Sequence, residues 1–95
     1  MDLGIVLSAK DNVATVIRPI AAGEKVTYHF GDIPGGVVAK EDIPIYHKIA
    51  LRAITKGSDV VKYGCRIGAA QCDIQPGDLV HTQNLASFPG EEGSK

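Results

Sequence analysis

The apolar residues of this chain come in short, β-branched runs, and none lasts long enough to form a helix with one buried face. The runs "LGIVLS", "NVATVI", "KVTYHF" and "DVVKYG" are typical, and glycine, proline, asparagine or aspartate interrupts such runs every six to twelve residues. β-Branched and aromatic residues favour pleated strands, whereas the interrupting residues favour turns. The pattern predicts a mainly β fold of short strands and tight turns.

Four stretches of the sequence are alike. They are "IAAGEKV" (20–26), "IPIYHKI" (43–49), "ITKGSDV" (54–60) and "IQPGDLV" (74–80), each with an isoleucine and an aliphatic residue six positions later. In three of them the fourth position is glycine, which can take the positive φ that a tight turn requires. The stretches are too short and too unevenly spaced for a solenoid. We therefore expect a compact domain of corner turns, in which the chain leaves the core and re-enters it.

The chain length limits the domain organisation. Ninety-five residues are enough for one core but not for two. We expect a single domain over residues 1–85 and a disordered tail over 86–95, because "ASFPGEEGSK" has almost nothing to bury after Phe88. Within the domain, "SAKDNVA" (8–14) predicts a hairpin turn, and the glycine-rich "FGDIPGG" (30–36) predicts a loop.

Charge and cysteine content exclude several classes of partner. Ten basic residues face eleven acidic ones without a block of either sign, so we expect neither nucleic acid nor a membrane surface as partner. The start "MDLGIVLSAKDN" has no basic region of the signal-peptide kind, and no window approaches a membrane span, which predicts a cytoplasmic protein. Cys65 and Cys72 have neither redox-pair nor zinc-knuckle spacing, and we expect both to be buried as small hydrophobic residues.

The second of the four stretches is the unusual one. Tyr46 occupies the position of the glycine, and His47 and Lys48 follow it. On an exposed turn, a histidine can serve as a metal ligand, a general base or an anion contact, and a lysine can pair with a carboxylate. The alternative is that two polar residues simply face solvent.

A second candidate cluster lies in "DLVHTQNL" (78–85). If this segment is a strand, His81 and Gln83 share one face and could hold a metal or a hydroxylated ligand, although His81 could equally be a surface residue without a role. His29 lies in an ordinary strand pattern and is assigned none. The chain lacks HExxH, GxSxG and phosphate-loop motifs, and a catalytic metal site normally needs three or more ligands in a pocket. Any catalysis would therefore use a composite site shared with a second chain.

The run from Ala39 to Leu85 resembles the N-terminal region of altronate and galactarate dehydratases, a SAF-type module with a β-clip fold. The family pattern "DIPxGHKxAL" corresponds to "DIPIYHKIAL" (42–51), and "KYGxxIGxAxxDIxxGxxVHxHN" corresponds to "KYGCRIGAAQCDIQPGDLVHTQN" (62–84). Two positions depart from the pattern. Tyr46 replaces a glycine, which alters the turn, and Gln83 replaces a second histidine, which leaves this segment with one imidazole.

The resemblance implies a separate small subunit of a sugar-acid dehydratase that acts with a large catalytic subunit. Such an enzyme removes water from an aldonic or aldaric acid, such as altronate or galactarate, and gives a 2-keto-3-deoxy acid. A divalent metal ion, Fe(II), Mn(II) or Mg(II), is expected to be held mainly by the large subunit and to stabilise the developing negative charge. We expect His47 to be catalytic, Lys48, His81 and Asn84 to bind substrate, and His47 and His81 to be this chain's candidate metal ligands.

Two other functions fit the same residues. A small subunit of a sulfolactate-type lyase would eliminate sulfite instead of water from an acid of similar shape. A non-catalytic SAF module would bind a carbohydrate or assist assembly, and it would tolerate the loss of His47 and Lys48 together.

Overall fold

The computed structural model describes residues 2–87, which form nine short β-strands and no helix. The strands are β1 (Gly4–Ile5), β2 (Val13–Val16), β3 (Lys25–Phe30), β4 (Ile33–Val38), β5 (Lys48–Ala50), β6 (Asp59–Lys62), β7 (Cys65–Ala70), β8 (Leu79–Val80) and β9 (Leu85–Ser87). They form a four-stranded sheet in the order β1-β2-β5-β8, the hairpin β3-β4, and a three-stranded sheet in the order β6-β7-β9. The prediction of a mainly β domain is confirmed. The described part of the chain contains no helix that could span a membrane.

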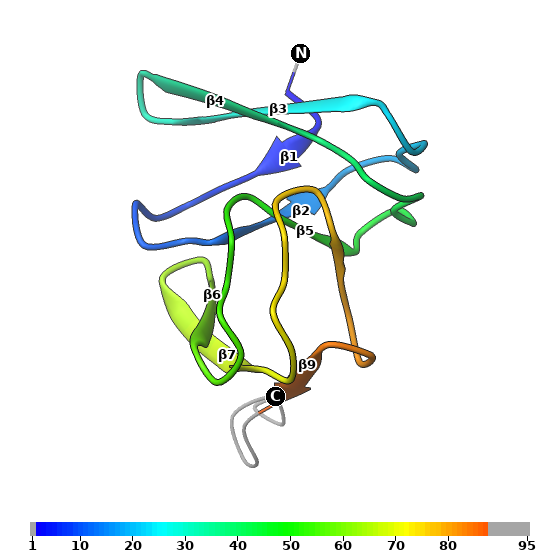
Figure 1. Cartoon of the computed structure of the whole chain (residues 1–95). Coiled ribbons are helices and arrows are strands. Elements are labelled where there is room, and N and C mark those ends of the chain that lie inside the picture. Colours follow the sequence, from blue (N-terminus) through cyan, green and yellow to red (C-terminus); the bar gives the residue numbers. More distant parts are fainter. Residues whose placement is uncertain (1, 88–95) are drawn as a thin grey trace.

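The four-stranded sheet lies between the other two (Figure 1), with the β3–β4 hairpin at one end of the molecule and β6, β7 and β9 at the other. Because side chains alternate along a strand, neighbouring residues of β2 and β5 enter two different cores. The hairpin-side core consists of Ala14, Val16, Ile20, Val26, Val37, Ala39, Ile43 and Ile49. The C-terminal core consists of Val13, Ala50, Ile54, Val60, Ala70, Ile74, Val80 and Leu85.

The four similar stretches are turns of one kind. The third residue of each turn has positive φ: 89° at Gly23, 66° at Tyr46, 89° at Gly57 and 92° at Gly77. A hydrogen bond of 2.9–3.1 Å closes each turn: Glu24 N to Ala21 O, His47 N to Pro44 O, Ser58 N to Thr55 O and Asp78 N to Gln75 O. These are the features of a type II turn, which needs positive φ at its third residue. The predicted corners are confirmed.

The corners associate in two pairs through the same contacts. Two isoleucines of each pair exchange two backbone hydrogen bonds of 2.8 Å: Ile20 with Ile43, and Ile54 with Ile74. In each pair an aspartate also accepts a hydrogen bond of 2.9 Å from a backbone N–H of the other corner: Asp42 from Ala22, and Asp73 from Lys56. The sequence similarity between the stretches therefore reflects two similar halves of one domain.

The loop predicted for residues 30–36 is wrong. Phe30 pairs with Ile33, and a tight turn with Gly31 at φ 60° joins β3 to β4. A proline is tolerated here because β4 is an edge strand, where no neighbour needs its missing N–H. Gly35 has a packing role on this strand, since a Cβ atom at that position would lie 2.4 Å from the ring of Tyr28.

Three further expectations concern the surface and the ends of elements. The hairpin turn at 8–14 is confirmed between β1 and β2. The burial expected for Cys65 and Cys72 is wrong, because both lie beside turns, where their side chains are exposed. Ala86 and Ser87 belong to β9, and the rest of the predicted tail, 88–95, lies outside the described residues.

Candidate functional site

Tyr46 is held in a conformation that glycine adopts more easily. Its φ is 66°, and 72% of its surface is exposed, so burial of the ring does not explain the conformation. Left-handed backbone costs a residue with a side chain roughly 1–2 kcal/mol. The turn persists because its backbone is fixed on both sides: Tyr46 N donates to Val16 O at 2.9 Å, and His47 N donates to Pro44 O at 3.1 Å.

His47 and His81 lie together, as the register of β5 and β8 requires. Lys48 pairs with Val80, so the next position outward places His47 opposite His81. Their ring centroids are 4.9 Å apart and the ring planes are tilted by 54°. His47 is half-buried and His81 is exposed. The two histidines on which the predicted site depends therefore form one cluster at the surface.

The hydrogen bond of His47 defines its tautomer. His47 Nδ1 lies 3.1 Å from Ile45 O, and a carbonyl oxygen can only accept, so Nδ1 carries the proton. In the neutral ring, Nε2 then holds the free lone pair and can accept a proton or bind a metal ion. This is the arrangement that a general base or a metal-ligating histidine needs.

Two imidazoles at this spacing could share one metal ion. Imidazole nitrogens bind divalent ions at about 2.0–2.1 Å, and the ring centroids of His47 and His81 are 4.9 Å apart. Within residues 2–87, however, no group of three histidine, cysteine, aspartate or glutamate side chains could hold an ion. The donors present fit part of a metal site, and the remaining ligands would have to come from elsewhere.

Lys48 does not point toward the histidine pair. It follows His47 directly, so its side chain leaves the opposite face of β5, on the side of the C-terminal core with Ala50 and Val80. Burial lowers the pKa of Lys48 below its ordinary value, and the positive charge of Lys62 lowers it further. The side chains of Lys48 and His47 therefore point to opposite faces of the sheet, and Lys48 is separated from the histidine pair.

Asn84 shapes the turn that carries His81. It is 7% exposed; its Oδ1 accepts from His81 N at 2.9 Å, and its Nδ2 donates to Leu79 O at 2.8 Å. The condition that 78–85 is one strand is not met, because β8 ends at Val80, a turn follows, and β9 begins at Leu85. Gln83 also donates to the Leu79 carbonyl, at 3.1 Å. Contact of Asn84 with substrate stays a prediction.

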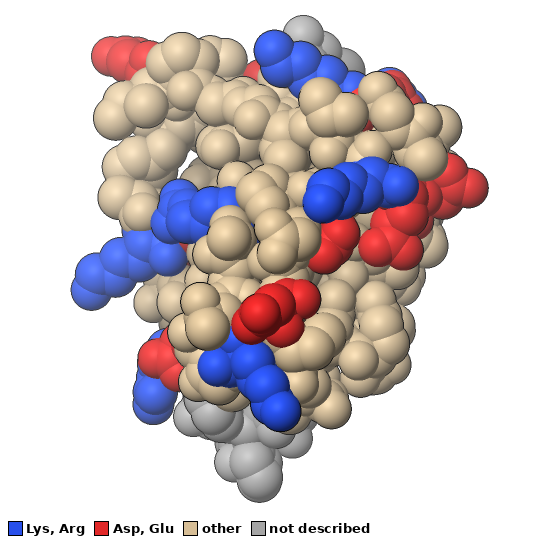
Figure 2. Space-filling view, viewed as in Figure 1, with Lys and Arg blue, Asp and Glu red and all other residues tan. Residues whose placement is uncertain are grey.

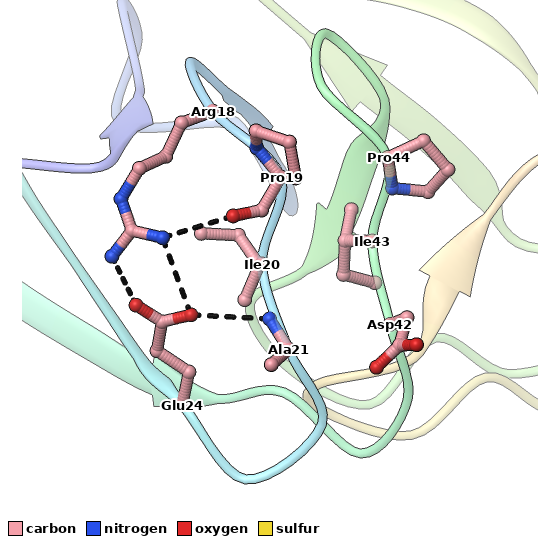
Figure 3. A pocket seen from close by; sticks show the side chains of 8 residues that line it. All are labelled: Arg18, Pro19, Ile20, Ala21, Glu24, Asp42, Ile43 and Pro44. Atoms are coloured by element: carbon pink, nitrogen blue, oxygen red, sulfur yellow. Dashed lines mark hydrogen bonds and ion pairs between the residues drawn. The ribbon is translucent and has the colours of Figure 1, made fainter.

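A pocket of 380 Å³ between the first two corners lies outside the predicted set (Figure 3). Arg18 and Glu24 form an ion pair on one side of it, and their mutual hydrogen bond raises the pKa of Arg18 and lowers that of Glu24. Arg18 also donates to Pro19 O at 2.9 Å. Arg18 therefore already has a carboxylate partner in Glu24.

A second pocket, of 250 Å³, lies between the β1–β2 turn and the β3–β4 hairpin, where Val6, Tyr28 and Ile33 contribute to its lining. None of the four predicted site residues lines either pocket. Of the histidine pair, His81 is exposed and His47 is half-buried.

The sequence analysis singled out neither Thr15, which lies opposite Lys48, nor Lys62, whose charge acts on Lys48. Thr15 is the cross-strand partner of Lys48, and its hydroxyl is buried without a hydrogen-bond partner. Lys62 acts on Lys48 from β6. The proximity of Thr15 to Lys48 could be predicted only from the register of β2 and β5, and this requires knowing which segments pair.

Comparison with known proteins matches residues 3–88 to the altronate/galactarate dehydratase SAF domain. Altronate dehydratase of Escherichia coli is 39% identical over 80 residues, which are 84% of this chain and 15% of that enzyme. The (2R)-sulfolactate sulfo-lyase subunit alpha of Paracoccus pantotrophus is 48% identical over 48 residues, 50% of this chain and 72% of the relative. That of Chromohalobacter salexigens is 32% identical over 84 residues, 85% of this chain and 89% of the relative. The chain thus belongs to the SAF domain family of the altronate/galactarate dehydratases.

Proposed function

We propose that this SAF domain is the small subunit of a sugar-acid dehydratase, with an aldonic or aldaric acid such as altronate or galactarate as substrate. The observation that carries the proposal is the surface pair of His47 and His81, with His47 Nε2 free to accept a proton, in a chain of this family. The similarity to altronate dehydratase supports the hydro-lyase reaction. A cytoplasmic location belongs to the same proposal.

The histidine pair would complete a site built mainly by a large catalytic subunit. Two imidazoles are too few for a catalytic metal centre, and the similarity to proteins named subunit alpha supports assembly from more than one chain. When bound, a divalent ion (Fe(II), Mn(II) or Mg(II)) would supply Lewis-acid stabilisation of negative charge on the substrate. His47 and His81 are the residues of this chain that could contribute to holding it.

In the proposed reaction, His47 accepts a proton from the substrate. A proton leaves the carbon next to the carboxylate and is accepted at Nε2, and the hydroxyl of the neighbouring carbon then departs with that proton as water, which returns His47 to its neutral form. The resulting enol rearranges to the 2-keto-3-deoxy acid. His81, held by Asn84 through its backbone N–H, would orient the substrate beside His47. Lys48 would pair with a carboxylate from the other face of β5.

Coexpression with the product of a neighbouring gene for a large dehydratase chain tests this proposal. We expect dehydration of galactarate or altronate by the complex, and we expect His47→Ala to lower kcat about a hundredfold or more, the usual contribution of a general base. The thermal unfolding midpoint should hardly change. His29→Ala is the matched control, since His29 is an exposed histidine that contacts Asp2 and lies in neither predicted cluster. Full activity of the large chain alone would contradict the composite site.

Sulfite elimination is the second candidate, favoured by the 48% identity to a sulfolactate sulfo-lyase subunit alpha. The same complex, supplied with sulfolactate, would release sulfite instead of a dehydrated sugar acid. A module that only binds carbohydrate or assists assembly would leave both activities of the complex unchanged when His47 and Lys48 are replaced together.

A further inference from the structure

The β3–β4 hairpin extends past the core that its inner end covers. Residues two apart along a strand share a face, and so do residues directly opposite each other. Val26 with Val37, and Phe30 with Ile33, are therefore on the same side of the hairpin. Val26 and Val37 are buried in the hairpin-side core, whereas Phe30 is 37% exposed and Ile33 is 66% exposed. The apolar face of the hairpin is thus left uncovered toward its turn.

This uncovered end forms one wall of the 250 Å³ pocket. Phe30 and Ile33 line the pocket from the hairpin, and Val6 and Leu51, which pack against the hairpin-side core, line it from the other side. In Figure 2 the molecule is hollowed beneath the turn of the hairpin (upper left), and basic side chains lie below the hollow. Pockets that enclose a whole small ligand usually measure about 300–1,000 Å³. The smaller volume suits single side chains of a larger molecule.

Arg52 lines the same pocket with an unmatched charge. It is exposed and makes no hydrogen bond or ion pair within residues 2–87. Its equivalent in the other half of the domain is Arg18, since each arginine lies two positions before the first isoleucine of its corner. Arg18 pairs with Glu24, but the position equivalent to Glu24 is Ser58, which carries no charge. Of two equivalent arginines, one is neutralised by its own chain and the other is not.

Asp11 is the acidic residue in the lining of this pocket, and its carboxylate is already used. Asp11 is 1% exposed, and its oxygens accept from the backbone N–H groups of Leu7, Ser8 and Gly64 at 3.0, 3.2 and 2.7 Å. The guanidinium of Arg52 therefore stays available. A guanidinium binds a carboxylate through two parallel, charge-assisted hydrogen bonds. The charge of the pocket thus complements an acidic group.

We propose that this pocket binds a partner chain through an aspartate or glutamate side chain that lies between apolar residues. The carboxylate pairs with Arg52, and the apolar neighbours cover Phe30 and Ile33. Arginine contributes strongly at protein interfaces where apolar neighbours exclude water. The inference deepens the proposed function, on which the identity of the partner as the large catalytic subunit rests. The pocket is separate from the histidine pair, so its binding can be measured without turnover.

The test uses the isolated full chain and the capped peptide acetyl-Leu-Asp-Leu-amide, with backbone amide NMR shifts as the readout. We expect shifts confined to residues around the pocket. Arg52→Gln should weaken binding about tenfold, the usual effect of losing one charged contact. The same peptide with asparagine in place of aspartate should bind the unmodified chain equally weakly. Arg18→Gln is the matched control, because Arg18 is the equivalent arginine and already pairs with Glu24.

Ile33→Ser tests the apolar part of the pocket. It should weaken binding of the aspartate and asparagine peptides by the same few-fold factor, because it removes apolar contact area and no charge. Ile33 is 66% exposed on an edge strand, and Arg52 is exposed without a partner in residues 2–87. Neither substitution should therefore change the unfolding midpoint, which shows that lost binding is not lost folding.

Association with the large chain is the second measurement. A tenfold loss in Arg52→Gln, but not in Arg18→Gln, assigns the pocket to the interface with that chain, and a loss with the peptide alone assigns it to another chain of the same chemistry. If Arg52→Gln changes neither, the proposal is overturned. Propionate binding as tightly as the aspartate peptide would also overturn it, in favour of a small acid. A complex that forms through Arg52 but dehydrates no sugar acid would contradict the proposed reaction and support the interface.

Discussion

At the scale of single residues, Tyr46 is one of two residues other than glycine that have positive φ within residues 2–87; the other is Tyr63, with φ of 56°. Three equivalent corners have glycine with φ of 89° to 92°, and Tyr46 takes 66° while 72% exposed. The ring gains little from burial, so burial does not offset the strain of this backbone. Strained residues of this kind often occur at functional sites.

Replacing Tyr46 by glycine should stabilise the isolated domain. The strain of roughly 1–2 kcal/mol is removed, while the greater freedom of glycine in the unfolded chain returns about half of that gain. The free energy of unfolding in urea should rise by up to about 1 kcal/mol. Gly23→Ala is the reverse control, since a Cβ atom there meets nothing within 4 Å and only strain is added. A loss of stability in Tyr46→Gly would mean that the ring makes a stabilising contact.

At the scale of elements, Asn84 makes two side-chain hydrogen bonds within the turn after β8, in addition to the backbone bonds from Asn84 N and Leu85 N to His81 O. Asn84→Ala removes the hydrogen bonds to His81 N and Leu79 O and leaves the part-buried N–H of His81 without this acceptor, which should cost about 1 kcal/mol in urea unfolding. Gln83→Ala is the control, because Gln83 is exposed and makes one bond to the same carbonyl. The chemical shifts of the His47 ring should change only in Asn84→Ala. Equal effects of both variants would show that the turn does not depend on Asn84.

The sequence predicts corners better than it predicts strand ends. The glycine pattern was sufficient for the corners because positive φ is a local requirement. The sequence did not predict the strand at Pro34, because an edge strand tolerates proline. It also did not predict that β8 ends before His81, where Asn84 makes side-chain hydrogen bonds within a turn. The separation of Lys48 from His47 follows from alternation once β5 is known to be a strand. The proximity of His47 to His81 needed the pairing of β5 with β8, which no local pattern contains.

At the scale of the whole molecule, the fourth corner joins the two halves of the domain. Gly77 O accepts from Lys40 N at 3.0 Å, so this corner packs against the end of β4. A Cβ atom on Gly77 would lie 2.1 Å from Val38 O, a backbone atom that cannot move aside as a flexible side chain can. Gly57 has nearly the same φ, but nothing lies within 4 Å of the equivalent position. The two glycines thus have the same conformational requirement and differ only in packing.

Substitutions at Gly57 and Gly77 can separate the energetic cost of backbone strain from the cost of losing contact between the two halves. Gly57→Ala adds strain alone and should cost about 1 kcal/mol. Gly77→Ala adds the same strain and also forces the corner away from β4, which should raise the total to about 3 kcal/mol or more. Equilibrium unfolding of both variants in urea measures the difference, and unchanged m-values would show that both still unfold as one unit. Because β8 follows this corner directly and pairs with β5, displacement of the corner should also separate His81 from His47. Equal losses of stability, with the histidine shifts unchanged, would mean that the halves are joined without the contact between Gly77 and β4.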